Sequence, residues 1–134
     1  MLEKARKIII KLASFQDVSY EHFPNSSRFK IISKNGVKWS SRASKLGNIH
    51  YSDDHLYFAL DYPSGKITES DILKKLNLPQ KNPGDKNTGF YVIQDSKFDT
   101  VRISLYQDKL ADQKYLDKTL IDFAEEILNK SKGK

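Results

Sequence analysis

The sequence contains no cysteine. Disulfide bonds, thiolate nucleophiles and zinc sites with thiolate ligands are therefore excluded, and such a chain suits a reducing compartment better than a secreted one. Long apolar runs are also missing. Ile8, Ile9 and Ile10 follow basic residues, but Lys11 ends this run well short of the roughly 7 to 15 residues of a signal-peptide core. No segment approaches the roughly 18 apolar residues that span a bilayer. We therefore expect a cytoplasmic protein with no membrane partner.

The sequence does contain an excess of positive charge, which lies in its first 48 residues. The net charge of the whole chain is +6; the first 48 residues contribute +7, from ten Lys and Arg against three acidic residues, and the remainder contributes −1. An uneven field of this kind attracts anionic partners without specifying which anion. At 134 residues, the chain is long enough to bury a core without a disulfide or a structural metal. We expect residues 1–134 to form a single domain.

Apolar residues recur at helical spacing in two long segments, one at each end of the chain. The first runs to Ala13, with Ile8, Ile9 and Leu12 on one face and lysines on the others. The second extends beyond Leu116 and ends in a frayed basic tail at residues 130–134. A shorter helix, Glu69–Asn77, is predicted between them. The predicted apolar stripe of the last helix consists of Leu116, Leu120, Phe123, Ile127 and Leu128.

Alternating or β-rich segments bounded by turn residues predict the strands. Asn35-Gly36 predicts a tight hairpin, because its turn needs positive φ at both central residues, and the register pairs Ile32 with Trp39. Gly47 is expected to break the chain. Residues 80–89 contain no aliphatic or aromatic side chain and are expected to form a flexible loop. The predicted strands are Phe29–Lys34, Val37–Ser41, His55–Tyr62, into which Ile49–Tyr51 leads, Phe90–Ile93 and Thr100–Tyr106, and the pattern permits a further short strand at Asp17–Phe23.

These elements predict an α+β fold: a mainly antiparallel sheet of five to six strands, with the N- and C-terminal helices packed on one face. The predicted order is one helix, three to four strands, a helix, two strands and a last helix. This order resembles the layout of type III secretion chaperones and related small domains. The resemblance is one of element order alone, without a shared motif, and those chaperones are generally acidic whereas this chain is basic.

Basic residues interleaved with aromatic ones form the first candidate site. A basic two-stranded ribbon can enter a major groove, and aromatic rings on a basic sheet can stack unpaired bases. The alternative is that the lysines are solvated residues that discourage edge pairing, and that Trp39 belongs to the core. The candidate nucleic-acid-binding residues are Arg28, Lys30, Lys34, Lys38, Arg42, Lys45, Lys81 and Lys86, accompanied by the aromatic residues Phe29, Trp39 and Tyr51.

Two histidines near an acidic turn form a second candidate site. If Ser52-Asp53 closes a two-residue turn, His50 faces His55, and the two imidazoles with Asp53 or Asp54 could hold a divalent metal. If the turn has three residues, Tyr51 faces His55 instead. The alternative to a metal site is that the aspartates are turn residues and the histidines half-exposed strand residues.

Scattered acidic residues allow a third hypothesis. Asp61 and the Asp95-Ser96-Lys97 segment, with Asp99, loosely match the acidic pair and lysine of metal-dependent nucleases of the restriction-endonuclease type. Other catalytic motifs fail on spacing. Ser64-Gly65-Lys66 lacks the upstream glycine of a phosphate-binding loop, because Leu60 occupies that position, and no Gly-x-Ser-x-Gly elbow is present.

We therefore predict a non-catalytic binding module that needs no cofactor and whose basic N-terminal half engages an acidic partner, with the nucleic acid phosphate backbone as the leading candidate. The alternative is a protein–protein interaction module, such as an adaptor, an immunity-type inhibitor or a chaperone-like domain, for which a homodimer is possible. A metal-dependent nuclease is the third hypothesis.

Overall fold

The computed structural model describes residues 1–34 and 45–131, with the backbone alone at Lys45 and Ser131. Its helices and strands follow one another in the predicted order. They are α1 (Leu2–Ala13), β1 (Val18–Phe23), the 3-10 turn η1 (Pro24–Ser26), β2 (Arg28–Ser33), β3 (Lys45–Tyr51), β4 (Leu56–Pro63), α2 (Glu69–Leu76), β5 (Gly89–Ile93), β6 (Phe98–Leu105), α3 (Gln107–Leu110), the π-helical turn η2 (Tyr115–Leu120) and α4 (Ile121–Ser131).

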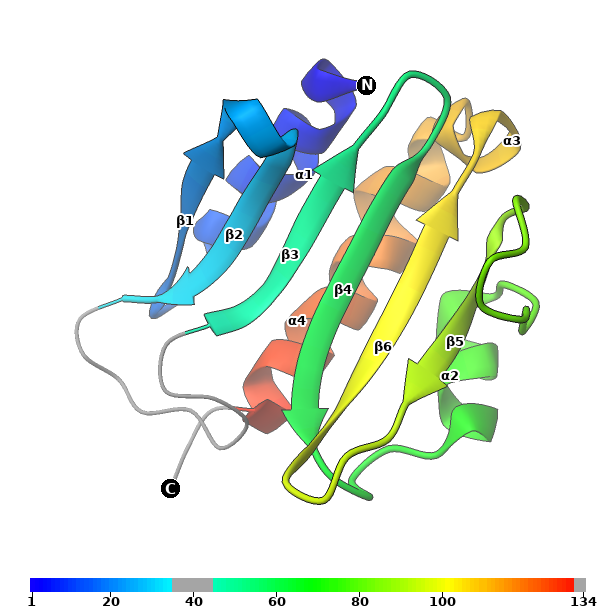
Figure 1. The fold of residues 1–134 in the computed structure, drawn as a ribbon. Coiled ribbons are helices and arrows are strands. Elements are labelled where there is room, and N and C mark those ends of the chain that lie inside the picture. Colours follow the sequence, from blue (N-terminus) through cyan, green and yellow to red (C-terminus); the bar gives the residue numbers. More distant parts are fainter. Residues whose placement is uncertain (35–44, 132–134) are drawn as a thin grey trace.

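The six strands form one antiparallel sheet in the order β1-β2-β3-β4-β6-β5. The helices lie on one side of it: in Figure 1, α1 and α4 run behind the sheet, and the opposite face is turned to the viewer with no described helix on it. The predicted α+β class and the placement of both terminal helices on one face are confirmed. A sheet covered on one side only leaves a second face for other contacts.

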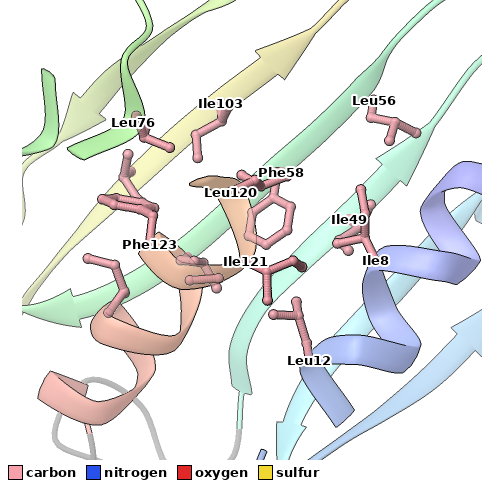
Figure 2. Close-up of a cluster of buried hydrophobic side chains, with 14 of the residues drawn as sticks. Ile8, Leu12, Ile49, Leu56, Phe58, Leu76, Ile103, Leu120, Ile121 and Phe123 are labelled. Carbon is pink, nitrogen blue, oxygen red and sulfur yellow. The ribbon is translucent and has the colours of Figure 1, made fainter. Parts of the chain in front are cut away.

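The core lies between the sheet and the helices (Figure 2). Ile8 and Leu12 of α1 and Phe123 of α4 lie on the side of the helices that faces the sheet with Ile49 of β3 and Phe58 of β4, and all five are buried. The predicted apolar stripe of the last helix is buried along its whole length, although that helix begins with the π-helical turn η2, which periodicity did not predict. Burial of this apolar surface is the main force that holds the two layers together.

Gly47 lies inside β3 and does not break the chain. A β-carbon built on Gly47 would stand 2.1 Å from the Ala59 carbonyl oxygen of β4, so only glycine permits this close approach of the two strands. On the other edge of β3, the pairing with β2 shifts register between Ile31 and Ile32. The expectation of a break at Gly47 was wrong because glycine here serves backbone contact and not a turn.

The predicted pairing of Ile32 with Trp39 is also wrong. A strand has two edges, and at Ile32 both are occupied, one by Ser19 of β1 and the other by Lys45 of β3. Val37–Ser41, including Trp39 and Lys38, and the Asn35-Gly36 turn lie outside the described residues.

The turn between β4 and α2 follows the predicted chemistry. The Asp71 amide donates to the Thr68 hydroxyl at 3.1 Å, which caps α2 as expected. Gly65 adopts φ of +74° in the preceding turn. The Ser64-Gly65 turn is fixed by Asp99, whose buried carboxylate accepts from the Ser64 hydroxyl at 3.3 Å and the Gly65 amide at 3.2 Å.

Candidate functional site

Five side chains from five strands share the face of the sheet that the helices leave uncovered. The register places Arg28 opposite His50, His50 opposite Tyr57, and Arg102 opposite Tyr91, while Arg102 is also the diagonal neighbour of Tyr57. Their strand neighbours on the other face, such as Phe29, Ile49 and Phe58, are buried against the helices. We call Arg28, His50, Tyr57, Arg102 and Tyr91 the open-face row; all five are half-buried.

At one end of the row, Arg28 lies over an aromatic ring. Its guanidinium carbon is 4.8 Å from the centroid of the Phe23 ring, a cation–π distance, and its Nη1 approaches the Asn48 Oδ1 at 3.5 Å. The Arg28 Nε is buried and has no hydrogen-bond partner in the described part of the chain. The ring therefore holds the guanidinium while leaving hydrogen-bonding capacity unused.

Near the other end, Arg102 lies over Tyr57. The guanidinium carbon is 5.6 Å from the Tyr57 ring centroid, and the Tyr57 hydroxyl is 3.2 Å from that of Tyr91. The Tyr57 and His50 rings lie 6.0 Å apart, which continues the row toward Arg28. The Arg102 Nε, like that of Arg28, has no hydrogen-bond partner among the described residues. Two arginines on aromatic supports thus stand at two separate places on one face.

The two tyrosines of this pair differ in acidity. Burial, together with the hydrogen bond to Tyr91, raises the pKa of Tyr57 to about 12. Burial also opposes ionisation of Tyr91, but the hydrogen bond with Tyr57 and the Arg102 charge outweigh it and lower the pKa of Tyr91. Tyr91 is therefore the first of the two to lose its proton as the pH rises.

Three lysines of the helical layer, Lys11, Lys75 and Lys118, form ion pairs, whereas the two arginines of the open-face row form none in the described part of the chain. Lys11 pairs with Asp117, Lys75 Nζ lies 2.5 Å from Glu126, and Lys118 Nζ lies 3.8 Å from Asp122; the Lys4 ammonium donates to the Leu110 carbonyl at 2.7 Å. Within residues 1–34 and 45–131, neither Arg28 nor Arg102 forms an ion pair. The charges of these two arginines are therefore not compensated by an acidic side chain among the described residues.

The structure describes only some members of the predicted cationic ribbon. Arg28 and Lys30 share the uncovered face of β2, where Lys30 is opposite Glu21, and Lys34 is exposed just beyond that strand. Lys38 and Arg42 lie outside the described residues, and of Lys45 only the backbone in β3 is described. The lysines of α1 belong to the helical layer on the far side of the sheet, so the positive charge of the first half is divided between two sides of the molecule.

The two predicted lysines of the loop at residues 80–89 differ in their surroundings. The Lys81 ammonium donates to the Asp85 carbonyl, to the Asn87 carbonyl at 3.2 Å and to the Ser104 hydroxyl at 3.2 Å, so it ties the loop to β6. Lys86 is exposed. The aromatic partners predicted for base stacking, Phe29 and Tyr51, lie on the helix-facing side of the sheet, and Phe29 is fully buried.

The histidine pairing expected for a metal site does not form. Tyr51 pairs with Leu56, which leaves a four-residue connection, and neither of the two predicted turn lengths occurs. His50 joins the open-face row, whereas His55 stacks on Tyr106 at 4.8 Å between ring centroids. The described residues contain no group of three or more acidic or histidine side chains placed to hold a metal ion.

The acidic residues of the nuclease hypothesis are also not brought together. Asp61 and Asp99 occupy neighbouring strands but opposite faces of the sheet, because their registers differ by one residue. Asp61 accepts from the Thr100 hydroxyl at 2.7 Å, and the Asp95 carboxylate accepts from the Lys97 amide at 3.4 Å within its own turn. These contacts are structural. The nuclease arrangement was wrong because the pleat separates carboxylates that the sequence places close together.

The comparisons with known proteins leave the family open. No family model matches the chain, and no curated protein matches it. A solved structure described as that of the HopA1–SchA chaperone–effector complex is similar to this chain at 10% identity, over 96% of this chain and 95% of that one, with a TM-score of 0.39. A similarity at this level establishes neither a shared fold nor a shared function. In the part of the chain that the structure describes, no helix has the length and apolar character needed to cross a bilayer.

Proposed function

We propose that this protein is a non-catalytic interaction module that binds an acidic segment of a protein partner on the open-face row. The observation that carries this proposal is that two arginines, Arg28 and Arg102, stand over aromatic rings on one open face without an ion-pair partner among the described residues. Some lysines of the helical layer, Lys11, Lys75 and Lys118, have acidic partners within the fold, whereas among the described residues Arg28 and Arg102 have none. Carboxylates are the natural complement of such guanidinium groups, because charge-assisted hydrogen bonds to them are strong and often bidentate.

The composition of the row favours a protein partner over nucleic acid. Tyrosine and arginine are enriched at the centres of protein interfaces. A base would need a free ring face for stacking, but Phe23 and Tyr57 each already carry a guanidinium over the ring. A nucleic acid backbone would also need further positive side chains along its path, but the lysines of the helical layer lie on the other side of the sheet. These points support the protein-interaction alternative of the sequence analysis.

A fluorescence anisotropy titration tests this function. A labelled Glu-rich peptide, long enough to contact Arg28 and Arg102 at the same time, is compared with single-stranded DNA and RNA oligonucleotides at low and at high salt. We expect the peptide to bind, and each of Arg28→Ala and Arg102→Ala to weaken it about tenfold, because one charge-assisted hydrogen bond is worth about 1.5 to 3 kcal/mol. The control variant Lys74→Ala/Lys114→Ala removes two exposed charges from the helical side and should change affinity by less than about twofold.

Two results would contradict the proposal. If the oligonucleotides bind through these arginines and the peptide does not, the row is a nucleic acid surface. If neither ligand binds at low salt, the open-face row is not an anion-binding site.

A further inference from the structure

The two supported arginines of the open-face row stand apart from each other. Arg28 is on β2 and Arg102 on β6, with β3 and β4 between them. Three strand spacings of about 4.8 Å, combined with an offset of two residues at about 3.4 Å each, separate their α-carbons by about 16 Å. The offset follows from the register, in which Tyr57 continues the Arg28 and His50 line while Ala59 is the residue opposite Arg102.

The surface between the two arginines presents two aromatic rings. The His50 and Tyr57 rings lie there with centroids 6.0 Å apart, and Asn48 and Ala59 share the same face. An acidic group would be less well placed there than at either end, because the arginines are at the ends of this stretch and an aromatic ring presents a negative face. An apolar or proline-rich stretch of a ligand can instead pack on these rings.

Resting on the proposed function, we infer that the row has two anchors and selects a partner segment that crosses the strands and carries two acidic groups about 16 Å apart, separated by an apolar stretch. One acidic group binds at Arg28, beside Phe23 and Asn48. The other binds at Arg102, where the Tyr91 hydroxyl can donate a second hydrogen bond. A single acidic cluster reaches only one anchor at a time.

Polyproline peptides provide rulers for this inference, because their helix rises about 3.1 Å per residue and returns to the same side every three residues. Ligands with an Asp pair at each end and two, five or eight prolines between the inner aspartates separate those aspartates by about 9, 19 and 28 Å. We expect the five-proline ruler to bind most tightly, by about tenfold over the shortest, since the arginine side chains can take up the remaining few ångströms.

A double-mutant comparison makes the test specific. Arg28→Ala and Arg102→Ala should each remove the tenfold preference for the five-proline ruler over the shortest ruler. Because either change alone already removes this preference, the double variant should not reduce it much further. With the two-proline ruler each single variant should weaken binding by about twofold only, because the other anchor still serves. Lys74→Ala/Lys114→Ala is again the matched control.

The outcomes separate this inference from the proposed function. If all three rulers bind equally while the Glu-rich peptide still depends on both arginines, the two-anchor spacing is wrong and the proposed function stands. The same conclusion follows if no ruler binds but that peptide does. If neither the rulers nor the peptide bind, both proposals fail.

Discussion

Replacing Gly47 by alanine tests the packing of the two central strands. The added β-carbon would stand 2.1 Å from the Ala59 carbonyl oxygen and 3.1 Å from its carbon, both backbone atoms that cannot rotate away. An ordinary carbon–oxygen contact is about 3.3 Å or longer, so β3 must move from β4 by more than about 1 Å. Such a movement weakens the ladder hydrogen bonds near Gly47 and loosens the core beneath.

The expected cost is about 3 to 5 kcal/mol in the free energy of unfolding. Two weakened backbone hydrogen bonds contribute about 1 kcal/mol each, and forced overpacking of the kind expected here adds about 1 to 3 kcal/mol. That is a large part of the roughly 5 to 15 kcal/mol that stabilises a domain. Urea unfolding followed by circular dichroism measures it directly.

Gly84→Ala is the matched control. Gly84 has φ of +92° but nothing within 4 Å of an added β-carbon, so alanine there meets backbone strain alone, about 1 to 2 kcal/mol. If Gly47→Ala proves no more destabilising than Gly84→Ala, the close approach of β3 and β4 is wrong.

Three further predictions concern stability. Asp99→Ala should cost about 1 to 3 kcal/mol in urea unfolding, because it removes the acceptor that joins two turns. Burial raises the pKa of Tyr62 and of Tyr115, so the unfolded chain releases these protons first as the pH rises; above pH 10 stability should fall by up to about 2.7 kcal/mol per pH unit, measured by urea titrations at several pH values. Lys11→Ala breaks a half-exposed ion pair with Asp117 and should cost less than about 1 kcal/mol, with a smaller difference from the native chain at high salt.

Each of these has a result that would refute it. Unchanged stability of Asp99→Ala would mean that its carboxylate does not hold the turns. Constant stability above pH 10 would contradict the assigned cause. So would an undiminished loss of stability in a Tyr62→Phe/Tyr115→Phe variant, in which the loss should be smaller. A salt-independent loss in Lys11→Ala would point to packing by its aliphatic stem in place of charge.

The sequence predicted the fold because its local signals agree with the packing. The alternation in the strand of Phe58 and the helical spacing of Ile8 and Leu12 both place apolar residues on the side that becomes the core. The strand neighbours of Ile32 were less predictable. The Asn35-Gly36 signal suggested a neighbour for Ile32, but which strands occupy the edges of β2 depends on long-range pairing that local propensity does not encode.

The candidate site was the least predictable part. Arg28 was identified from its basic surroundings, but Arg102 and Tyr91 lie in the half of the chain with no excess charge, and only the β6 pairings bring them to the same face as Arg28. The alternation of Arg102 with the buried Val101 and Ile103 already indicated that it faces away from the core. No local pattern indicated that Tyr57 would lie beneath it, because that contact joins two strands far apart in sequence.

The most direct test of this account is the affinity of one labelled Glu-rich peptide for the native protein, for Arg28→Ala/Arg102→Ala and for Lys74→Ala/Lys114→Ala, measured by anisotropy at low salt. Both variants lose two positive charges, so bulk electrostatics alone would weaken them equally. We expect the first to lose about a hundredfold in affinity and the second less than about twofold, with both folded by circular dichroism. Equal losses in the two variants would contradict a specific site on the open face of the sheet.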